Sequence, residues 1–323
     1  MNWRKDLAEN YKKPLVILAG PTAVGKTALS VELAGKIDAE IISADSMQVY
    51  RHMDIGTAKI KENEMCGIRH HLIDIFEPGD EFNVTIFKEL AKKSIDDITE
   101  RGKIPILAGG TGFYIQAVLN DISFTEHETD TGLRDELSRY AKENGNEALY
   151  HRLVSIDSDA AAKIHPNNVK RVIRAIEYCM TTGGLFSKHN ETESEKKPPY
   201  NFVYFVLTMD RETLYERIDR RIDTMLEHGL VEEVRGLLSS GCSKCMVSMQ
   251  GLGYKEVIDY INGVTSYDEM VYILKRDTRH FAKRQLTWFK REKDVIWIDK
   301  DKMDGDVLIE YMLEKLREKR VIR

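Results

Sequence analysis

Residues 20–27 read GPTAVGKT and match the pattern G-x-x-x-x-G-K-[ST], which constrains the fold of this 323-residue chain more than any other segment. An apolar run at 15–20 precedes the motif and a helical pattern begins near Lys26. In such a loop, glycines let the backbone wrap around phosphate oxygens, and N–H groups at the helix N-terminus attract the anion. The predicted phosphate-binding loop (P-loop) comprises Gly20, Pro21, Thr22, Ala23, Val24, Gly25, Lys26 and Thr27.

Two side chains of this loop carry its chemistry. Lys26 adds a point charge beside the phosphates, and the Thr27 hydroxyl is placed to hold Mg²⁺. A glycine-rich turn with an exposed lysine is the structural alternative. The motif does not distinguish a diphosphate from a triphosphate. An ATP-driven enzyme also carries a carboxylate at a strand end for its metal, and Asp45, Asp74 and Asp210 all lie at or near such ends, so this criterion leaves the ligand open.

Apolar runs and helical patterns alternate along the first third of the chain and return near its end. The predicted strands are 15–20, 40–45, 68–75, 104–109, 201–210 and 294–299. Residues 82–102 predict a helix with Asn83 as its N-cap and Gly102 as its stop. This alternation predicts an α/β fold with a P-loop NTPase-like parallel sheet and helices on both of its faces.

The character of the chain changes between about residues 126 and 197, where strand-like runs vanish and polar helical patterns replace them. The segment KHNETESEKKPPY (188–200) is charged and contains prolines, which is typical of a domain boundary or a mobile loop. The sequence therefore predicts an α/β core with C-terminal helices at 1–121 and 201–323, interrupted by an inserted all-helical domain at 122–200.

Charge and cysteine usage limit the class of protein. A formal net charge of −5 argues against indiscriminate binding to nucleic acid, but residues 275–293 hold a local basic patch. No window approaches eighteen apolar residues and no apolar segment follows the basic N-terminus, so we expect neither a membrane span nor a secretory signal. Four scattered cysteines fit a reducing compartment, and we expect a cytoplasmic protein. The pair Cys242 and Cys245 has no second pair nearby, which favours two loop thiols over a metal or redox site.

Eight segments, in order along nearly the whole chain, resemble those of the bacterial tRNA dimethylallyltransferases (tRNA isopentenyltransferases). They are GPTAVGKT (20–27), ISADSMQVYRHMDIGTAK (42–59), HHLID (70–74), AGGTGFY (108–114), HPNNVKRVIRAIE (165–177), RIDRRIDTMLEHGLVEEV (217–234), QGLGYKE (250–256) and RHFAKRQLTWFKR (279–291). The resemblance implies transfer of a dimethylallyl group from dimethylallyl diphosphate to N6 of the adenosine 3′ of the tRNA anticodon (position 37). The expected partner is a tRNA anticodon stem-loop, which is large enough to occupy a monomer alone.

The resemblance also assigns catalytic roles. It makes the P-loop, with Lys26 and Mg²⁺, the site of the prenyl diphosphate, because the departing diphosphate must have its charge stabilised. Arg221, one helical turn after Arg217, is the expected extra clamp, and a solvated helix face is the alternative for both arginines. Asp45 is the expected base for the amine proton, with a metal-ligand role as its alternative. Thr22 is placed to touch both substrates.

An enzyme that modifies a base must take that base out of its stack and hold the RNA around it. The resemblance places such contacts on three stretches of the core and on the inserted domain. The expected tRNA-binding residues are Asp45, Ser46, Met47, Gln48, Thr111, Arg134, Lys170, Arg171, Arg174, Gln250, Gly251, Leu252, Gly253, Tyr254 and Lys255. Some relatives have arginine at the position of Gln250, which puts base discrimination there in doubt.

Two stripes run along the C-terminal basic segment. One consists of Arg276, Arg279 and Lys283. We expect these residues either to contact the RNA backbone or to form a solvated helix face. The other consists of Leu274, Phe281 and Trp288, which recur every seven residues. This spacing favours a place in the apolar core over a role in stacking on RNA bases.

Two other classes of function compete with the prenyltransferase. A P-loop kinase acting on a small molecule or nucleoside shares the phosphate loop but needs no RNA-binding insertion. An RNA-binding or chaperone-like NTPase makes no covalent change. The segments KRVIR (170–174) and QGLGYKE favour the transferase. His70 and His71 lie in a predicted strand, where one of them at most faces the core, and we expect both to be structural.

Overall fold

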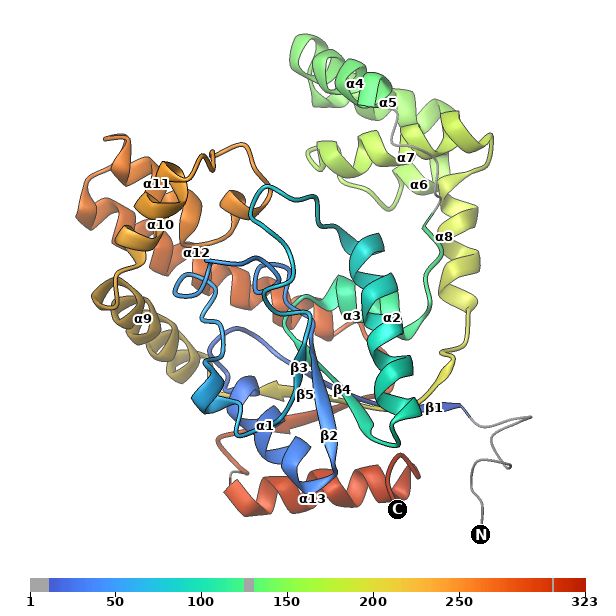
Figure 1. Ribbon diagram of the computed structural model, residues 1–323. Helices are drawn as coiled ribbons and strands as arrows, with labels where there is room; N and C mark the ends of the chain where they lie inside the picture. The colour runs from blue at the N-terminus through green and yellow to red at the C-terminus, as the bar shows by residue number, and fades with distance from the viewer. Residues whose placement is uncertain (1–11, 125–130, 304) are drawn as a thin grey trace. The chain divides into compact units, whose positions relative to one another are not determined.

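The computed structural model describes residues 12–124, 131–303 and 305–323 (Figure 1). The chain divides into two compact units, each described by itself below. The first, which we call the core unit, consists of Met1–Leu119 and Pro199–Arg323, and the second, the helical unit, of Asn120–Pro198.

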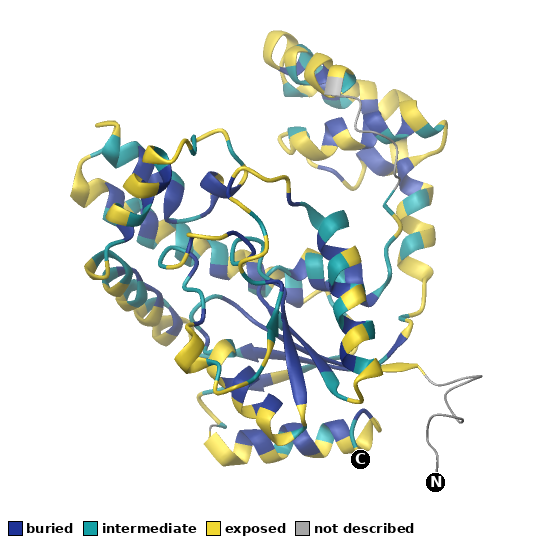
Figure 2. Cartoon of the chain, in the orientation of Figure 1, coloured by how far each residue is buried: buried dark blue, intermediate teal, exposed yellow. Residues whose placement is uncertain are grey.

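The core unit contains a six-stranded sheet in which all strands run parallel, in the order β3-β2-β4-β1-β5-β6. The strands are β1 (Lys13–Ala19), β2 (Ala39–Ser43), β3 (His70–His71), β4 (Ile104–Gly109), β5 (Tyr200–Thr208) and β6 (Val295–Asp299). Strand β1 is fully buried from Leu15 to Ala19, which explains its uninterrupted apolar run. Figure 2 shows most of the sheet as buried. The predicted parallel α/β fold is confirmed.

The register of the sheet brings four chain segments to one edge. Ala19, the last residue of β1, pairs with Gly109 on β4 and with Val206 on β5, and Ser43 at the end of β2 pairs with Ala108. The segments that follow β1, β2, β4 and β5 therefore leave the sheet side by side. In open α/β sheets, ligands bind beyond these carboxyl ends.

Helices cover both faces of the sheet, as predicted. Figure 1 shows α1 and α13 on one side and α2 and α3 on the other. The helices of the core unit are α1 (Lys26–Lys36), α2 (Val84–Glu100), α3 (Gly112–Leu119), α9 (Arg211–Glu227), α10 (Leu230–Ser239), α11 (Tyr254–Ile261), α12 (Tyr267–Phe289) and α13 (Gly305–Glu318), with short 3-10 turns η1 (Glu62–Glu64) and η2 (Ser248–Gln250).

Helix starts follow from capping side chains. Asn83 accepts hydrogen bonds from the backbone N–H groups of Thr85 and Ile86 at 2.9 and 3.1 Å, so α2 begins where the sequence predicts. Asp210 caps α9 in the same way, through the N–H groups of Glu212 and Thr213.

Two predictions are confirmed only in part. The third strand was expected at 68–75 but comprises only His70–His71, because the chain leaves the sheet at Leu72, whose φ is +63°. The segment 188–200 contains the boundary between the two units, at Pro198 and Pro199, but much of it is helical, since α8 spans Phe186–Glu195. Only Phe186 and Ser187 of α8 are buried, so its sequence has no apolar periodicity to reveal the helix.

The helical unit consists of α4 (Thr131–Asn144), α5 (Asn146–Ile156), α6 (Ser158–Ala161), α7 (Val169–Thr182) and α8. Its own apolar core is separate from that of the core unit and includes Leu137, Leu149, Leu153, Val172 and Ile176. Asp157 is buried and accepts hydrogen bonds from the N–H groups of Ala160 and Ser187, which joins α6 to α8.

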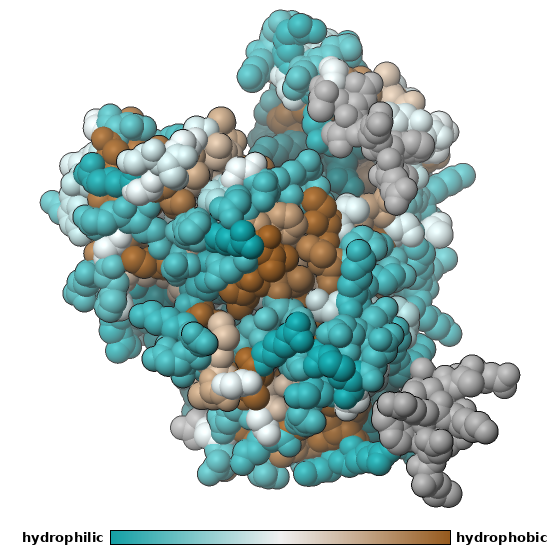
Figure 3. Space-filling model, in the orientation of Figure 1, coloured by the Kyte–Doolittle hydropathy of each residue, from teal (hydrophilic) through white to brown (hydrophobic). Residues whose placement is uncertain are grey.

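The surface drawn in Figure 3 is mainly polar, with an apolar area beside α2. None of the helices in the described residues is both long and apolar enough to cross a bilayer.

Candidate functional site

The P-loop joins β1 to α1 and depends on its glycines. Gly25 has φ +95°, a conformation that favours glycine. A Cβ on Gly20 would lie 2.8 Å from the backbone oxygen of Leu207, so the loop also passes too close to β5 for any other residue. The loop therefore has the strand–glycine loop–helix context that the motif requires.

Lys26 lies folded back over this loop. Its Nζ donates hydrogen bonds to the backbone oxygens of Gly20 and Pro21, at 2.9 and 2.7 Å. Burial, and then the nearby charge of Arg221, lower the pKa of Lys26 to about 7, against the opposing effect of Asp45. A lysine in this setting gains charge when an anion arrives.

A first cavity of about 370 Å³ opens in front of the loop and is strongly basic. It is lined by Ala23, Gly25, Lys26, Thr27, Arg217, Arg220 and Arg221. The arginines come from α9, and Arg217 is anchored because its Nε donates to the backbone oxygen of Ala23 at 2.9 Å. A Cβ on Gly25 would lie 3.1 Å from Lys300 Nζ, so a further cation, from the residue after β6, reaches the loop.

A second cavity of about 110 Å³ adjoins the first and shares Lys26, Thr27 and Arg221 with it. Part of its wall is apolar, formed by Ile41, Ala58, Ile60, Ile73, Ala108 and Phe281. Polar atoms come from Ser30, Ser43, Gln48 and His70. Burial lowers the pKa of His70, and the contact of its Nδ1 with the backbone oxygen of Ile68, at 2.9 Å, opposes this shift.

A third cavity of about 340 Å³ continues from the second and shares five residues with it, namely Thr22, Asp45, Arg221, Phe281 and Gln285. Its other walls are residues 46–47 and 56–57, Thr111, the stretch 250–255, and side chains of α9 and α12, namely Ile218, Ile222, Met225, Leu274, Thr278 and Arg284. Arg221 lines all three cavities, which therefore lie next to one another beside the P-loop.

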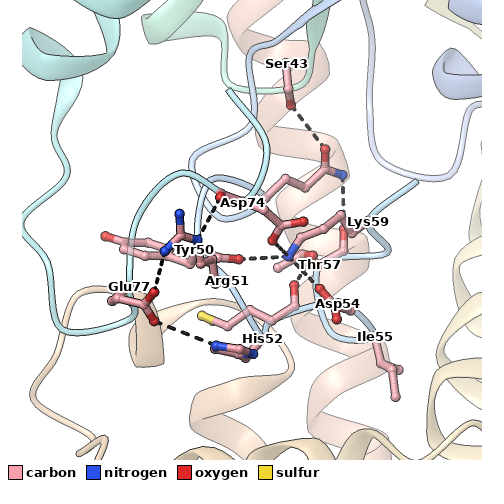
Figure 4. A network of polar contacts seen from close by, with 12 residues as sticks. Ser43, Tyr50, Arg51, His52, Asp54, Ile55, Thr57, Lys59, Asp74 and Glu77 are labelled. Atoms are coloured by element: carbon pink, nitrogen blue, oxygen red, sulfur yellow. Dashed lines mark hydrogen bonds and ion pairs between the residues drawn. The ribbon is translucent and has the colours of Figure 1, made fainter. Parts of the chain in front are cut away.

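Asp45 stands at the junction of the second and third cavities. Its Oδ1 accepts a hydrogen bond from the N–H of Met47 at 2.8 Å and a longer one from Gln48, which orients the carboxylate. The two other strand-end aspartates have different roles: Asp74 pairs with Lys59, as Figure 4 shows, and Asp210 caps α9. Among these three, Asp45 alone lines the cavities.

Gln285 of α12 joins two loops of the site, and sequence reasoning missed it. Its Oε1 accepts from the N–H of Thr22 at 2.8 Å, and its Nε2 donates to the backbone oxygen of Gly110 at 2.9 Å. The residue lies within the matched segment 279–291, but its spacing gives no sign that it reaches the P-loop. Arg220 and Lys300 were missed in the same way.

The residues expected to bind tRNA lie in several places. Residues around the third cavity are Asp45, Ser46, Met47, Thr111, Gln250, Gly251, Leu252, Gly253, Tyr254 and Lys255, whereas Gln48 lines the second cavity. The Tyr254 side chain is fully buried, so it can form a wall but offers no free edge. The Nε2 of Gln250 donates to the backbone oxygen of Lys244.

The expected residues of the inserted domain lie in the helical unit. Lys170, Arg171 and Arg174 are exposed on α7, and Arg134 on α4 pairs with Glu177 at 2.7 Å.

On α12 the predicted basic stripe is partly engaged. Arg279 makes a bidentate pair with Asp219 at 2.7 and 2.8 Å, and Arg276 pairs with Asp277. Lys283 is exposed and lines a surface groove with His280, Arg284, Thr287, Trp288 and Arg291.

The prediction that the apolar stripe belongs to the core is confirmed for Leu274, which is 2% exposed and belongs to the apolar core as well as to the wall of the third cavity. It is wrong for Phe281, which is half-buried and lines the second and third cavities.

The histidines and cysteines singled out earlier lie in different settings. His71 pairs with the buried Glu40 at 2.7 Å and is structural, as expected, whereas His70 lines the second cavity. Cys242 is half-buried and Cys245 exposed, and both are free thiols.

Comparisons with known proteins agree on one family. The family model described as IPP transferase matches residues 48–292. A tRNA dimethylallyltransferase of Lachnoclostridium phytofermentans is 58% identical over 312 residues, covering 96% of this chain and 100% of the relative. One of Acetivibrio thermocellus is 54% identical over 293 residues, covering 90% and 93%.

Solved structures show the same likeness. The tRNA isopentenylpyrophosphate transferase of Bacillus halodurans has a TM-score of 0.73 at 45% identity, covering 96% of this chain and 98% of its own. A eukaryotic dimethylallyltransferase acting on tRNA has a TM-score of 0.76 at 31% identity, covering 89% and 74%. The likeness therefore extends over nearly the whole chain.

Proposed function

Because this chain belongs to the IPP transferase family, we propose that it transfers a dimethylallyl group from dimethylallyl diphosphate to N6 of the adenosine 3′ of a tRNA anticodon. The observation that carries this proposal is the adjacency of the three cavities, with Thr22, Asp45 and Arg221 where they meet. The diphosphate occupies the first cavity, the five-carbon group the second and the acceptor base the third.

The first cavity suits a leaving group that gains negative charge. The P-loop N–H groups, Lys26 and the three arginines of α9 are preorganised around one point. These donors stabilise the negative charge that develops on the diphosphate as the C–O bond breaks. They therefore stabilise the transition state more than the bound substrate.

The donor set at the first cavity fits Mg²⁺. The Thr27 hydroxyl is exposed at the start of α1, and nowhere in the described ranges do three or more His, Cys, Asp or Glu side chains gather as an all-protein metal site. Mg²⁺ commonly takes few protein oxygens and completes its shell with substrate phosphates and water. Thr27 would therefore hold the ion together with the diphosphate, and the ion would neutralise charge on the leaving group.

The transfer itself exchanges one bond for another. The adenosine N6 attacks the allylic carbon, the new N–C bond forms, and the C–O bond to diphosphate breaks and leaves its electron pair on diphosphate. The N6 proton passes to Asp45, whose carboxylate is oriented by the N–H groups of residues 47 and 48. The Thr22 hydroxyl, at the same junction, contacts both substrates.

The RNA is held at the third cavity. Residues 45–47 and 250–255 with Thr111 line this acceptor cavity and, with Gln48 in the adjoining second cavity, read the flipped base and its neighbours. The helical unit carries exposed cations on α7, which suit contacts to the RNA backbone, and this unit is the tRNA-binding insertion. The enzyme acts as a cytoplasmic monomer on one anticodon stem-loop.

Label transfer tests the proposal. The protein is incubated with labelled dimethylallyl diphosphate, Mg²⁺ and an anticodon stem-loop, and label in the RNA is the expected result. Asp45→Asn should lower the rate by about 10²–10⁴ while RNA affinity stays within a few-fold. The surface variant Asp96→Asn, which loses only an exposed pair with Lys13, should retain full activity. ATP turnover without labelled RNA would favour the kinase instead.

A further inference from the structure

A carboxylate outside the three cavities holds one wall of the third. Glu233 on α10 accepts hydrogen bonds from three successive backbone N–H groups: Asp54 and Ile55 at 2.9 and 2.7 Å on Oε2, and Gly56 at 3.1 Å on Oε1. Successive N–H groups that converge on one anion form a backbone nest. In this nest the bound anion is the Glu233 side-chain carboxylate of the protein.

A fourth donor completes the arrangement. The Tyr254 hydroxyl donates to Glu233 Oε1 at 2.7 Å. Burial, and then the charge of Glu233, raise the pKa of Tyr254 well above its usual range, so the hydroxyl remains a donor at all working pH values. An ionised carboxylate has about four acceptor positions, and these four donors use them.

Glu233 thereby joins two walls of the acceptor cavity without lining it. Residues 56–57 form one wall and residues 250–255 another, and Glu233 is absent from the lining. The two walls touch, because a Cβ on Gly56 would lie 2.6 Å from the Tyr254 ring. The position of the 54–56 backbone against α11 therefore sets the width of the cavity.

The segment 45–59, which we call the acceptor loop, is cross-linked internally, as Figure 4 shows. The Lys59 side chain is only 5% exposed and binds the Tyr50 backbone oxygen at 2.8 Å and Asp54 at 2.6 Å. Gln48 accepts from Ser43 at 3.1 Å and donates to the Thr57 backbone oxygen at 3.3 Å. A shift at the nest is therefore transmitted to Asp45 and its neighbours at the other end of the loop.

We propose that Glu233 is a positioning residue for the acceptor adenosine: it fixes the acceptor loop against α11 so that the cavity and Asp45 are in place before RNA binds. This rests on the proposed function, since the acceptor is the adenosine of the stem-loop. Glu233 contacts neither substrate and acts on the acceptor side only. The P-loop and the arginines of α9, which hold the donor, make none of its four hydrogen bonds.

The test compares Glu233→Gln with Glu232→Gln, its exposed sequence neighbour, which lines none of the three cavities. Glutamine keeps the size of the side chain but turns an –NH₂ group toward backbone N–H groups. We expect Glu233→Gln to raise the KM for the stem-loop about tenfold or more while the KM for dimethylallyl diphosphate stays within about twofold. Amide hydrogen exchange at residues 54–56 should accelerate, and Glu232→Gln should match the wild type in every readout.

A second variant, Tyr254→Phe, removes one of the four hydrogen bonds and leaves the ring in place. We expect its KM for the stem-loop to rise about two- to fivefold, in proportion to a single lost bond. If Glu233→Gln does not fold, Tyr254→Phe alone tests the proposal.

Two outcomes would overturn the inference: an RNA KM within twofold of wild type in the folded variants, or equal rises in the KM values of donor and acceptor. Failure of the proposed function would look different, because the wild type and Glu232→Gln would then not label RNA at all.

Discussion

At the scale of single residues, Lys26 combines two demands that usually conflict. The lysine must be charged to bind diphosphate, yet it is held among the P-loop backbone and beside Arg221, and burial leaves its pKa at about 7. Its Nζ meanwhile donates to the carbonyls of Gly20 and Pro21. The arriving anion supplies the negative partner that this ammonium lacks, so donor binding and protonation of Lys26 are linked.

The linkage has a definite sign. Above pH 7 free Lys26 is largely neutral, and the bound diphosphate raises its pKa, so donor binding takes up a proton. Affinity for dimethylallyl diphosphate should fall as pH rises above 7, by up to about tenfold per pH unit, until the pKa of the complex is reached. Calorimetry in buffers of different ionisation enthalpy measures the uptake. Lys26→Met should bind weakly with no uptake above pH 7, and a wild type without uptake would refute the linkage.

At the scale of elements, α12 is more than a basic surface helix. Gln285 is 7% exposed and spans from the P-loop to the segment after β4, and a Cβ on Gly110 would lie 2.2 Å from its Nε2. The loops that carry Thr22 and Thr111 are therefore held at a fixed separation by a side chain from a third element. Both loops line the acceptor cavity.

Gln285→Ala should leave the part-buried N–H of Thr22 and the buried carbonyl of Gly110 without this partner, which lowers the free energy of unfolding by about 1–3 kcal/mol. Because a small misplacement of the reacting groups is costly, kcat should fall about 10- to 100-fold. Steady-state kinetics and urea denaturation measure both effects. Thr287→Ala on the same helix, whose hydroxyl bonds only to the Lys283 backbone oxygen in this structure, is the control. An unchanged kcat in Gln285→Ala would show that Gln285 does not position the two loops for the reaction.

Strand β2 leads to Asp45 and is anchored by a buried charge network at its start. Glu40 is 3% exposed, and its carboxylate accepts hydrogen bonds from Arg101 and His71, each at 2.7 Å on Oε2. The hydrogen bonds from Arg101 lower the pKa of Glu40 to about 2, burial opposes this, and His71 assists. Edge strand β3 is held to the sheet in part through this group.

A depressed carboxylate pKa makes stability depend on acid. The contribution of Glu40 is complete above pH 4.5 and is lost as pH falls from 4.5 toward 2. Arg101→Met, which leaves the carboxylate buried without its main partner, should cost about 3–5 kcal/mol at pH 7. In Glu40→Gln this part of the acid dependence should disappear. Urea denaturation at pH 7 and pH 3 tests both predictions. If the free energy of unfolding falls equally between these pH values in the wild type and in Glu40→Gln, titration of Glu40 does not cause the acid dependence.

At the scale of the whole molecule, the sequence predicts local features well and long-range contacts poorly. The P-loop, Asp45 and the pair Arg217 and Arg221 were found because a motif, a strand end and a helical repeat each mark them within a few residues. Gln285 and Glu233 were not, because their partners lie 263 and about 178 residues away, and only the packing of α12 and α10 against the loops of the site brings them together. Helix α8 was missed because it buries too little to show a period.

The helical unit contributes affinity by charge in this account. Lys170, Arg171 and Arg174 are exposed on α7, and each phosphate contact adds about 0.7–0.9 to the slope of log affinity against log salt. Replacing all three by alanine should lower that slope by about 2 and weaken stem-loop binding at low salt, with donor KM unchanged. Fluorescence anisotropy at several salt concentrations measures it. Lys142→Ala on α4 is the control, and an unchanged slope in the triple variant would remove α7 from the RNA interface.

The central claim is that the P-loop holds the leaving group of a prenyl donor while Asp45 faces the incoming amine. A crystal structure with an unreactive thiolo analogue of dimethylallyl diphosphate and an anticodon stem-loop tests it most directly. The account predicts the diphosphate against Lys26, Thr27 and Arg221, and the flipped adenosine N6 about 3 Å from the Asp45 carboxylate. An isoprenoid bound elsewhere, with the P-loop empty or filled by ATP, would contradict it.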